Sequence, residues 1–390
     1  MEPLHRSRAA IDEIDRQLLE LLARRMRAVR DIAAVKRESA ETPLHDPERE
    51  RRLYEFWTRE GSKLGLSPYF VGRVLKEVLT YSRRDQERRL DAAGGDEPGA
   101  AVRVAYQGVP GSYSDLALEK LFQSRPHAAL RKEGHETFEG TLDALEAGEA
   151  DYALLPIENT IAGSIHDVYR ELAQRRVALV DEEIWRVEHC LAARPGTRLA
   201  DLRRIRSHPV ALQQCSGFLR GLVGVRAESW YDTAAAAESV AAGDTTEVAA
   251  ICSAEAARAR GLDVLREGIA DQAENHTRFV LIGLELEPVD PRVPAKTSLL
   301  LTVDHRQGAL AECLNAFADA GLNLSKLESR PQPDLPWRYL FYLDVEANVE
   351  DPRMIATLDS IRRHAGGLRI LGCYPARAIV ERHRPRAGDR

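Results

Sequence analysis

The stretch that decides the fold of this chain is "LPIENTIAGS", residues 155–164. It follows the apolar residues "YALL" (152–155) and precedes "IHDVYRELA" (165–173), which has the apolar spacing of a helix. The pattern predicts a buried strand that gives way to a helix, with Glu158, Asn159 and Thr160 at the junction. Polar residues in this place either cap the helix or hold a polar ligand where a strand ends.

Strand and helix patterns alternate through the segment around this stretch. Strands are predicted at residues 102–108, 151–157 and 277–283, helices at 114–122 and 210–222, and a strand that runs into a helix at 248–262. We therefore expect an α/β fold with mainly parallel strand pairing. Polar residues gather where the predicted strands end, which is the usual binding crevice of open α/β sheets.

Two linkers divide the chain into three segments. "DAAGGDEPGA" (91–100) lacks apolar periodicity and "EPVDPRVPA" (287–295) is rich in proline, so we place domains at 1–91, 102–286 and 296–382. The third segment has strand patterns at 298–303, 322–329, 338–345 and 367–374, with helix patterns at 308–321 and 352–366. This β-α-β-β-α-β order predicts an α+β, ferredoxin-like domain in a multidomain protein.

The composition narrows the classes of function. The 390 residues are 44% hydrophobic and 30% charged, as in ordinary globular proteins, and no apolar run approaches the length of a membrane span. The start of the chain lacks the apolar core of a signal peptide, so we expect a cytoplasmic protein. The 5 cysteines form no CxxC pair and the histidines show no ligand spacing, so we expect neither a disulfide framework, a metal site nor a cofactor.

The first segment is predicted to be all-α, with three helices. Leu4, Ile11, Leu18 and Ile32 follow a seven-residue frame, and the helix they predict, from about 5 to 39, would be roughly 50 Å long. A compact domain of this size is only about 30 Å across, so the apolar stripe of such a helix needs a partner chain. Proline at the first helical position marks the starts of a second helix at 47 and a third at 68.

Charged residues interrupt the apolar stripe of the long helix. Arg25 occupies the slot between Leu18 and Ile32, where a charge is costly unless it is paired. Lys36 lies about 20° round the helix and roughly 16 Å along it, so both side chains can close on a small dianion. Taken singly, these residues are more often surface ion-pair residues of a helical bundle. Net charge is −6, yet the first 90 residues are basic, which hints at an anionic ligand.

This first segment resembles the all-helical class of chorismate mutase over its whole length. The matching positions are Arg8, Arg25, Lys36, Asp46, Arg49, Glu50, Ser82 and Gln86. The resemblance implies a homodimer with two shared active sites, in which Arg8 reaches into the partner's site. Arginine forks suit the two carboxylates of chorismate, and Lys36 and Gln86 are the expected donors to its ether oxygen.

The second segment resembles prephenate dehydratase, an α/β domain of two lobes. Four stretches carry the resemblance: "YQGVPGSYS" (106–114), "LPIENTIAGS", "SHPVALQQC" (207–215) and "NHTRF" (275–279). The resemblance implies Thr277 as the catalytic hydroxyl, and the expected substrate-binding residues are Glu158, Asn159, Thr160, Ser207, Gln214 and Arg278. Departure of hydroxide from prephenate needs a proton donor or a strong hydrogen bond. Thr277 and Glu158 are both candidates for that donor.

The third segment resembles the ACT domain that follows prephenate dehydratases. "QGALAECL" (307–314) opens a helix, whose free N–H groups suit a carboxylate, and "LESRP" (327–331) ends a strand. The resemblance implies that L-phenylalanine is an effector, and the expected effector-binding residues are Gly308, Ala309, Leu310, Glu328, Ser329 and Arg330.

The sequence thus predicts a bifunctional chorismate mutase–prephenate dehydratase with feedback inhibition by phenylalanine, working as a homodimer or a larger homo-oligomer. Two alternatives remain open: a sensor of amino acids or keto acids that has lost turnover, and a nucleic-acid-binding regulator with a basic helical arm. No nucleic-acid recognition motif supports the second, and we expect neither nucleic acid nor a membrane as partner.

Overall fold

The structure is a computed structural model that describes residues 2–38, 47–68, 70–72, 74–75, 78–79, 81–82, 101–123, 129–289, 295–303, 306–332 and 339–376. Two compact units make up the chain: the first holds residues 1–101 and 125–129, and the second holds residues 102–124 and 130–390.

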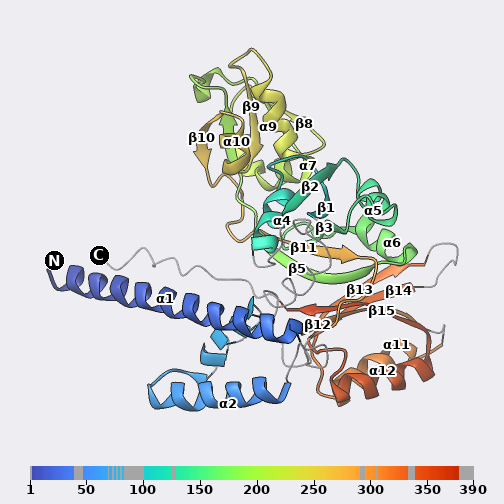
Figure 1. The fold of residues 1–390 in the computed structure, drawn as a ribbon. Coiled ribbons are helices and arrows are strands. Elements are labelled where there is room, and N and C mark those ends of the chain that lie inside the picture. Colours follow the sequence, from blue (N-terminus) through green and yellow to red (C-terminus); the bar gives the residue numbers. More distant parts are fainter. Residues whose placement is uncertain are drawn as a thin grey trace. The chain divides into compact units, whose positions relative to one another are not determined.

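The first unit is helical, as the sequence predicts. Helix α1 runs from Glu2 to Glu38 and α2 from Pro47 to Lys63 (Figure 1), and the described positions between 68 and 82 are helical as well. The apolar stripe of α1 is exposed within this chain: Ile14 keeps 62% and Leu18 55% of its surface in contact with solvent. The predicted capping residue Asp46 lies outside the described residues.

The second unit begins with a lobe built on a mixed sheet. Its strands are β1 (Val102–Gln107), β2 (Leu130–His135), β3 (Tyr152–Asn159), β4 (Gly163–Ser164), β5 (Ala178–Arg186) and β11 (His276–Gly283). Helices α4 (Tyr113–Gln123), α5 (Phe138–Glu146) and α6 (His166–Gln174) pack against these strands. The β3–β4–α6 passage is the strand-to-helix junction that "LPIENTIAGS" predicts.

A second lobe is inserted between β5 and β11. It contains β6 (Cys190–Ala193), β7 (Arg204–Ser207), β8 (Arg226–Ser229), β9 (Val248–Cys252) and β10 (Asp263–Glu267), in the order β10-β6-β9-β7-β8. Its helices are α7 (Pro209–Gln214), α8 (Ser216–Arg220), α9 (Thr233–Ala241) and α10 (Ala254–Ala259), with a 3-10 turn at Leu199–Asp201. The single helix predicted at 210–222 is wrong, because the chain breaks at Cys215 into α7 and α8.

The prediction of mainly parallel pairing is also wrong. Strands β1–β2, β1–β3, β7–β8 and β7–β9 pair in parallel, but β11 is antiparallel to both β3 and β5, and β6 is antiparallel to β9 and β10. The cause is the route of the chain: it leaves the first lobe after β5, builds the second lobe, and returns as β11 between β3 and β5 in the opposite direction.

Residues 295–375 form a C-terminal module with the predicted β-α-β-β-α-β order. Its elements are β12 (Ala295–Val303), α11 (Ala309–Asp319), β13 (Leu324–Pro331), β14 (Tyr339–Val345), α12 (Pro352–His364) and β15 (Ala365–Pro375), with strand order β13-β14-β12-β15. Helices α11 and α12 lie together on one face of this sheet (Figure 1), and Phe317 of α11 is buried in one core with Leu299 and Leu343 of the sheet.

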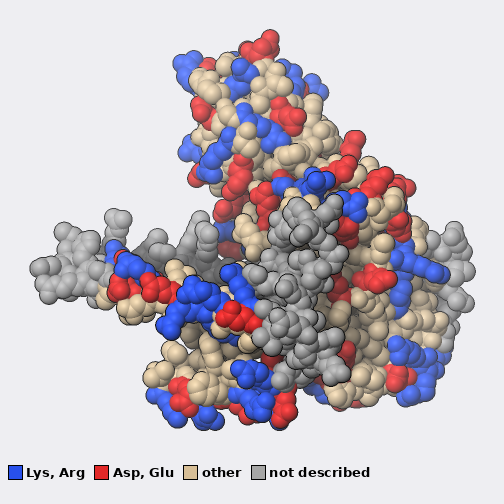
Figure 2. All heavy atoms as spheres, viewed as in Figure 1, with Lys and Arg blue, Asp and Glu red and all other residues tan. Residues whose placement is uncertain are grey.

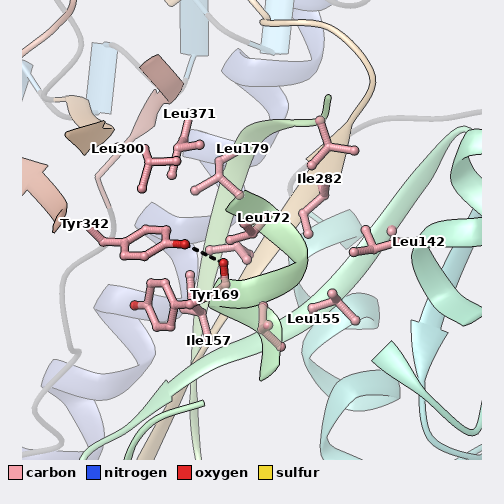
Figure 3. Close-up of a cluster of buried hydrophobic side chains, with 14 of the residues drawn as sticks. Leu142, Leu155, Ile157, Tyr169, Leu172, Leu179, Ile282, Leu300, Tyr342 and Leu371 are labelled. Atoms are coloured by element: carbon pink, nitrogen blue, oxygen red, sulfur yellow. Dashed lines mark hydrogen bonds between the residues drawn. The ribbon is translucent and has the colours of Figure 1, made fainter. Parts of the chain in front are cut away.

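The module is joined to the first lobe through a shared sheet and a shared core. Strand β15 pairs in parallel with β5 at Gly372, so the described strands of lobe and module form one ten-stranded sheet. A side chain at Gly372 would place its Cβ 2.1 Å from the carbonyl oxygen of Leu179, so this approach of the two strands requires glycine. Figure 3 shows the core beneath, where the Tyr342 hydroxyl donates to the carbonyl of Tyr169 at 2.6 Å.

Candidate functional site

The candidate dehydratase site lies where β3 ends and β11 begins. Asn159, the last residue of β3, is paired with Thr277 in the antiparallel ladder, which brings their side chains together. The Asn159 amide Nδ2 donates to Thr277 Oγ1 at 3.0 Å and to Asn275 Oδ1 at 2.7 Å. The Asn159 side chain is oriented from the other end as well, because its Oδ1 accepts from the backbone N–H groups of Ile161 and Ala162.

A residue of the second lobe completes this cluster. Gln214, at the end of α7, is buried, and its Oε1 accepts from Asn275 Nδ2 at 3.1 Å while its Nε2 donates to Asn159 Oδ1 at 3.4 Å. His189 Nε2 also lies 2.9 Å from Gln214 Oε1, and the Tyr113 hydroxyl lies 3.2 Å from His189 Nδ1. Burial lowers the pKa of His189, and the contact with Gln214 opposes that shift, so the ring is neutral near pH 7. We call Asn159, Gln214, Asn275, Thr277 and His189 the amide cluster.

Thr160 and Ser207 lie near the cluster, but their hydroxyl groups form hydrogen bonds with the backbone. Thr160 Oγ1 accepts from the N–H of His276 at 2.9 Å and so ties the loop after β3 to β11. Ser207, at the end of β7, is fully buried and donates to the carbonyl of Ile251 at 2.6 Å. Both residues hold strand ends in place.

Glu158 and Arg278 point away from the amide cluster. They are neighbours in the β3–β11 ladder, and successive residues of a strand face opposite sides of a sheet. Glu158 forms an ion pair with Lys326 of β13 at 2.8 Å. Arg278 binds Glu182 and Asp344, each at 2.6 Å. Both side chains therefore face the C-terminal module, and the structure does not bring them together with Thr277.

Three residues near Asn159 and Gln214 have no role predicted from the sequence. Asn275 and Tyr113 stand inside the quoted motifs "NHTRF" and "YQGVPGSYS", so the motif itself was the available signal. His189 follows strand β5 without any recognisable pattern. Only the fold shows that it reaches Gln214.

In the helical unit, the described residues place Arg25 beside Ser82. The half-buried guanidinium of Arg25 donates to Ser82 Oγ, and burial lowers the pKa of Arg25. Glu50 is buried, whereas Arg8 and Arg49 are exposed on their helices. Lys36 lies in α1, but the structure does not describe its side chain. Asp46 and Gln86 lie outside the described residues.

The predicted effector residues lie at two places in the C-terminal module. Gly308 adopts a left-handed conformation (φ 82°) immediately before α11, with Ala309 buried and Leu310 half-buried in the first turn. On β13, Glu328 Oε2 accepts from Ser164 Oγ at 2.9 Å, and Arg330 pairs with Glu328 at 2.6 Å. Ser329 faces the other side of the strand and is exposed.

The comparisons with known proteins agree with this division. The chorismate mutase type II family matches residues 7–87, and the prephenate dehydratase family matches residues 104–286. A bifunctional chorismate mutase/prephenate dehydratase of Enterobacter agglomerans is 35% identical over 378 residues, 97% of either chain. The chain belongs to this bifunctional family. It is an enzyme of phenylalanine biosynthesis with both a chorismate mutase and a prephenate dehydratase activity.

Two solved structures resemble the second unit of this bifunctional enzyme. One is a prephenate dehydratase from Arthrobacter aurescens in complex with L-Phe, with 30% identity and a TM-score of 0.64 over 70% of this chain and 90% of that one. The other, GqqA, described as a novel type of quorum quenching acylase, has 37% identity and a TM-score of 0.63 over 70% of this chain and 98% of that one.

Two further observations concern the expected partners. None of the described helices is long and apolar enough to cross a membrane. On the face that Figure 2 shows, basic and acidic side chains of the described residues are interspersed, with no continuous basic surface there. The nucleic-acid alternative gains no support from this face, because duplex binding relies on clustered cations.

Proposed function

We propose that Thr277 is the hydrogen-bond donor to the leaving hydroxyl group in the dehydratase, oriented by Asn159. The observation that carries this proposal is the 3.0 Å contact in which Asn159 Nδ2 donates to Thr277 Oγ1. Because one lone pair of Oγ1 is occupied by the amide, the hydroxyl hydrogen is directed elsewhere. It is then available to the hydroxyl group that leaves prephenate as carbon dioxide departs and the ring becomes aromatic.

Glu158, the rival donor, is less suited to this role. Its carboxylate pairs with Lys326, 2.8 Å away, and lies on the face of β3 opposite Asn159. A carboxylate held in this ion pair is directed toward β13 and away from Thr277. Thr277 instead contacts the neutral amide of Asn159, which is bonded in turn to the amides of Gln214 and Asn275, and these groups can orient the substrate without adding charge.

Three variants test the assignment. We expect Thr277→Val to lower dehydratase kcat by about 100-fold or more, because it removes the hydroxyl but keeps the shape. Thr277→Ser keeps the hydroxyl and should retain most of the activity, and Glu158→Gln should stay within a few-fold of the unmodified enzyme. Mutase activity of the same samples is the internal control. Loss of activity in Glu158→Gln alone would reverse the assignment.

For the mutase we propose a site shared between two copies of the chain. Arg25 and Ser82 form one wall, and the exposed apolar stripe of α1 is the surface that the second copy covers. Arg8, exposed near the start of α1, then contributes to the partner's site. Mixing inactive Arg8→Ala with inactive Lys36→Ala chains should restore part of the mutase activity; if mixing restores none, the sites are not shared.

We also propose that the C-terminal module is an ACT-type regulatory domain that binds L-phenylalanine. The β-α-β-β-α-β order, the glycine turn before α11 and the acidic residue Glu328 on β13 support this, as does the L-Phe complex of the Arthrobacter aurescens dehydratase. The N–H groups that open α11 suit a carboxylate, and Glu328 suits an ammonium group. Calorimetry should show heat with phenylalanine, less with tyrosine, and little with phenylalanine in Glu328→Gln; absence of heat with phenylalanine contradicts the proposal.

A further inference from the structure

The Asn159 side chain is the fixed point of the amide cluster. Its Oδ1 accepts from the backbone N–H groups of Ile161 and Ala162 at 3.0 and 2.8 Å, and a backbone N–H can only donate. The amide of Asn159 therefore has one orientation, with Nδ2 toward Asn275 Oδ1 at 2.7 Å. That contact leaves Asn275 Nδ2 to donate to Gln214 Oε1 at 3.1 Å. The backbone thus sets the direction of the hydrogen bonds between the three amides.

The same direction extends to the imidazole ring of His189. Its Nε2 lies 2.9 Å from Gln214 Oε1, which can only accept, so Nε2 carries a hydrogen. A neutral imidazole has one N–H, so Nδ1 is left as an acceptor. The Tyr113 hydroxyl lies 3.2 Å from Nδ1 and also donates to the carbonyl of Glu188 at 2.8 Å, so its hydrogen is shared between these two acceptors. The contacts therefore select one of the two tautomers of His189.

The selected tautomer fixes the amide of Gln214. With Oε1 held by donors from Asn275 and His189, the amide nitrogen faces Asn159 Oδ1 at 3.4 Å. This nitrogen carries two hydrogens, and the contact with Asn159 uses one of them, so the second is available to a ligand. Rotating the amide by 180° would set oxygen against Asn159 Oδ1 and nitrogen against the N–H groups of Asn275 and His189. The ring of His189 therefore opposes that rotation.

Tyr113 and His189 come from different parts of the second unit. Tyr113 opens α4 of the first lobe, whereas His189 lies in the segment that leads from β5 into the second lobe. The two rings meet edge to face, with centroids 5.8 Å apart. His189 is 3% exposed and Asn275 is fully buried, so water does not replace a donor that is lost here. The orientation of Gln214 consequently depends on this pair of rings.

We propose that His189, held as the Nε2–H tautomer by Tyr113, is a positioning residue of the dehydratase. It fixes the amide of Gln214, so that one N–H of Gln214 points to Asn159 and the other is offered to prephenate. The inference rests on the proposed role of Thr277, because Asn159 orients that hydroxyl. It gives His189 and Tyr113 a part in turnover through two amides.

The test measures kcat and KM for prephenate in the full chain, with mutase activity of the same sample as internal control. His189→Asn carries its amide near the position of Nδ1 and leaves Gln214 Oε1 without this donor, so kcat/KM should fall by about 10- to 100-fold. His189→Gln carries an N–H group to the position of Nε2 and should bring kcat/KM back to within about fivefold of the unmodified enzyme.

Tyr113 is tested with a matched control. Tyr113→Phe removes the donor to Nδ1, which allows the other tautomer, so kcat/KM should fall by about tenfold. Tyr342→Phe is the control, because it also removes a buried hydroxyl that donates to a backbone carbonyl, that of Tyr169. If both variants lower the urea midpoint but only Tyr113→Phe lowers kcat/KM, the loss belongs to the positioning of Gln214 and not to stability.

A spectroscopic measurement reports the tautomer itself. Protonated and unprotonated ring nitrogens of histidine give well-separated 15N resonances. In enzyme labelled with 15N-histidine, the signals that vanish in His189→Gln belong to His189. We expect a protonated Nε2 and an unprotonated Nδ1, and we expect Tyr113→Phe to increase the other tautomer, which a merely structural role of Tyr113 would not do.

Three results would overturn the proposal. They are a His189→Asn enzyme with kcat/KM within about twofold of normal, a His189→Gln enzyme as impaired as His189→Asn, and a ring protonated at Nδ1. The second result would show that the imidazole itself is required. Thr277→Val is measured alongside: if it stays active, the proposed role of Thr277 falls, whereas an inactive Thr277→Val beside a fully active His189→Asn removes this inference alone.

Discussion

Replacing Asn159 by aspartate changes the shape of the dehydratase site very little, but it puts a hydrogen-bond acceptor where the central donor was. The Asn159 Nδ2 group faces three oxygens: Asn275 Oδ1 at 2.7 Å, the His276 carbonyl at 3.2 Å and Thr277 Oγ1 at 3.0 Å. An aspartate oxygen in this place meets two oxygens that can only accept and one hydroxyl group. The Thr277 hydroxyl can rotate and donate to it, but the other two oxygens have no hydrogen to offer.

The magnitude follows from these contacts. Asn159 is 8% exposed, so water cannot replace the lost donors. The His276 carbonyl still accepts from the N–H of Thr160 at 2.9 Å, so Asn275 Oδ1 is the acceptor that loses its donor, and one such buried acceptor costs about 1–3 kcal/mol in the free energy of unfolding of the second unit. Because the Thr277 hydrogen is then used by the new carboxylate, we expect dehydratase kcat to fall by about 100-fold or more.

The assay follows phenylpyruvate formation and chorismate consumption on one preparation of Asn159→Asp. Mutase activity should be unchanged. Burial among acceptors raises the pKa of the new carboxyl, and its protonated form regains a donor, so activity relative to the unmodified enzyme should rise as the pH is lowered from 8 to 6. Asn323→Asp, which adds the same charge at an exposed position, should leave dehydratase kcat unchanged. An Asn159→Asp enzyme with more than half of the normal dehydratase kcat would refute the reasoning.

Three further outcomes are expected. Gly372→Ala should lower the free energy of unfolding by about 3 kcal/mol and separate the module from the lobe, because the new Cβ meets a backbone carbonyl. Gly367→Ala on the same strand has room for its Cβ and should leave the urea unfolding curve unchanged. Because burial lowers the pKa of His189 from 6.5, the unfolded chain binds a proton at this residue more readily than the folded chain does. The free energy of unfolding should therefore reach its full value above about pH 6.5 and decline as the pH falls below it. In urea titrations at several pH values, His189→Asn should make that decline smaller. Ser82→Ala removes the acceptor of the half-buried Arg25 and should lower mutase kcat/KM about tenfold, with dehydratase activity unchanged.

Local patterns predicted the elements of this fold well. The seven-residue frame of Leu4, Ile11 and Leu18 predicts the long helix, and a proline after a capping residue predicts the start of α2 at Pro47. The β-α-β-β-α-β order of the third segment could be predicted because short apolar strand runs are separated by helix patterns with clear ends. These features depend on contacts between residues that are close in sequence, which a single sequence reports directly.

Local patterns do not predict how strands that are far apart in the chain pair with one another. The return of β11 between β3 and β5 depends on where the second lobe ends, and no local signal sets that direction. The expectation that Arg278 binds the substrate shows the same difficulty. Thr277 and Arg278 are adjacent, so alternation already places them on opposite faces of a strand. Which face meets the crevice and which meets the module depends on Asn159 and Asp344, residues far away in the chain.

The same alternation lets one strand end take part in both the proposed catalysis and the proposed regulation. Asn159 faces the amide cluster, while its neighbour Glu158 binds Lys326 of β13, and Ser164 of the same passage binds Glu328. A ligand shifts an equilibrium only through contacts that differ between two states. An amino-acid ammonium that takes Glu328 as its partner competes with Ser164 for that carboxylate. Its binding energy therefore acts on the loop that ends β3, one residue from the amide that orients Thr277.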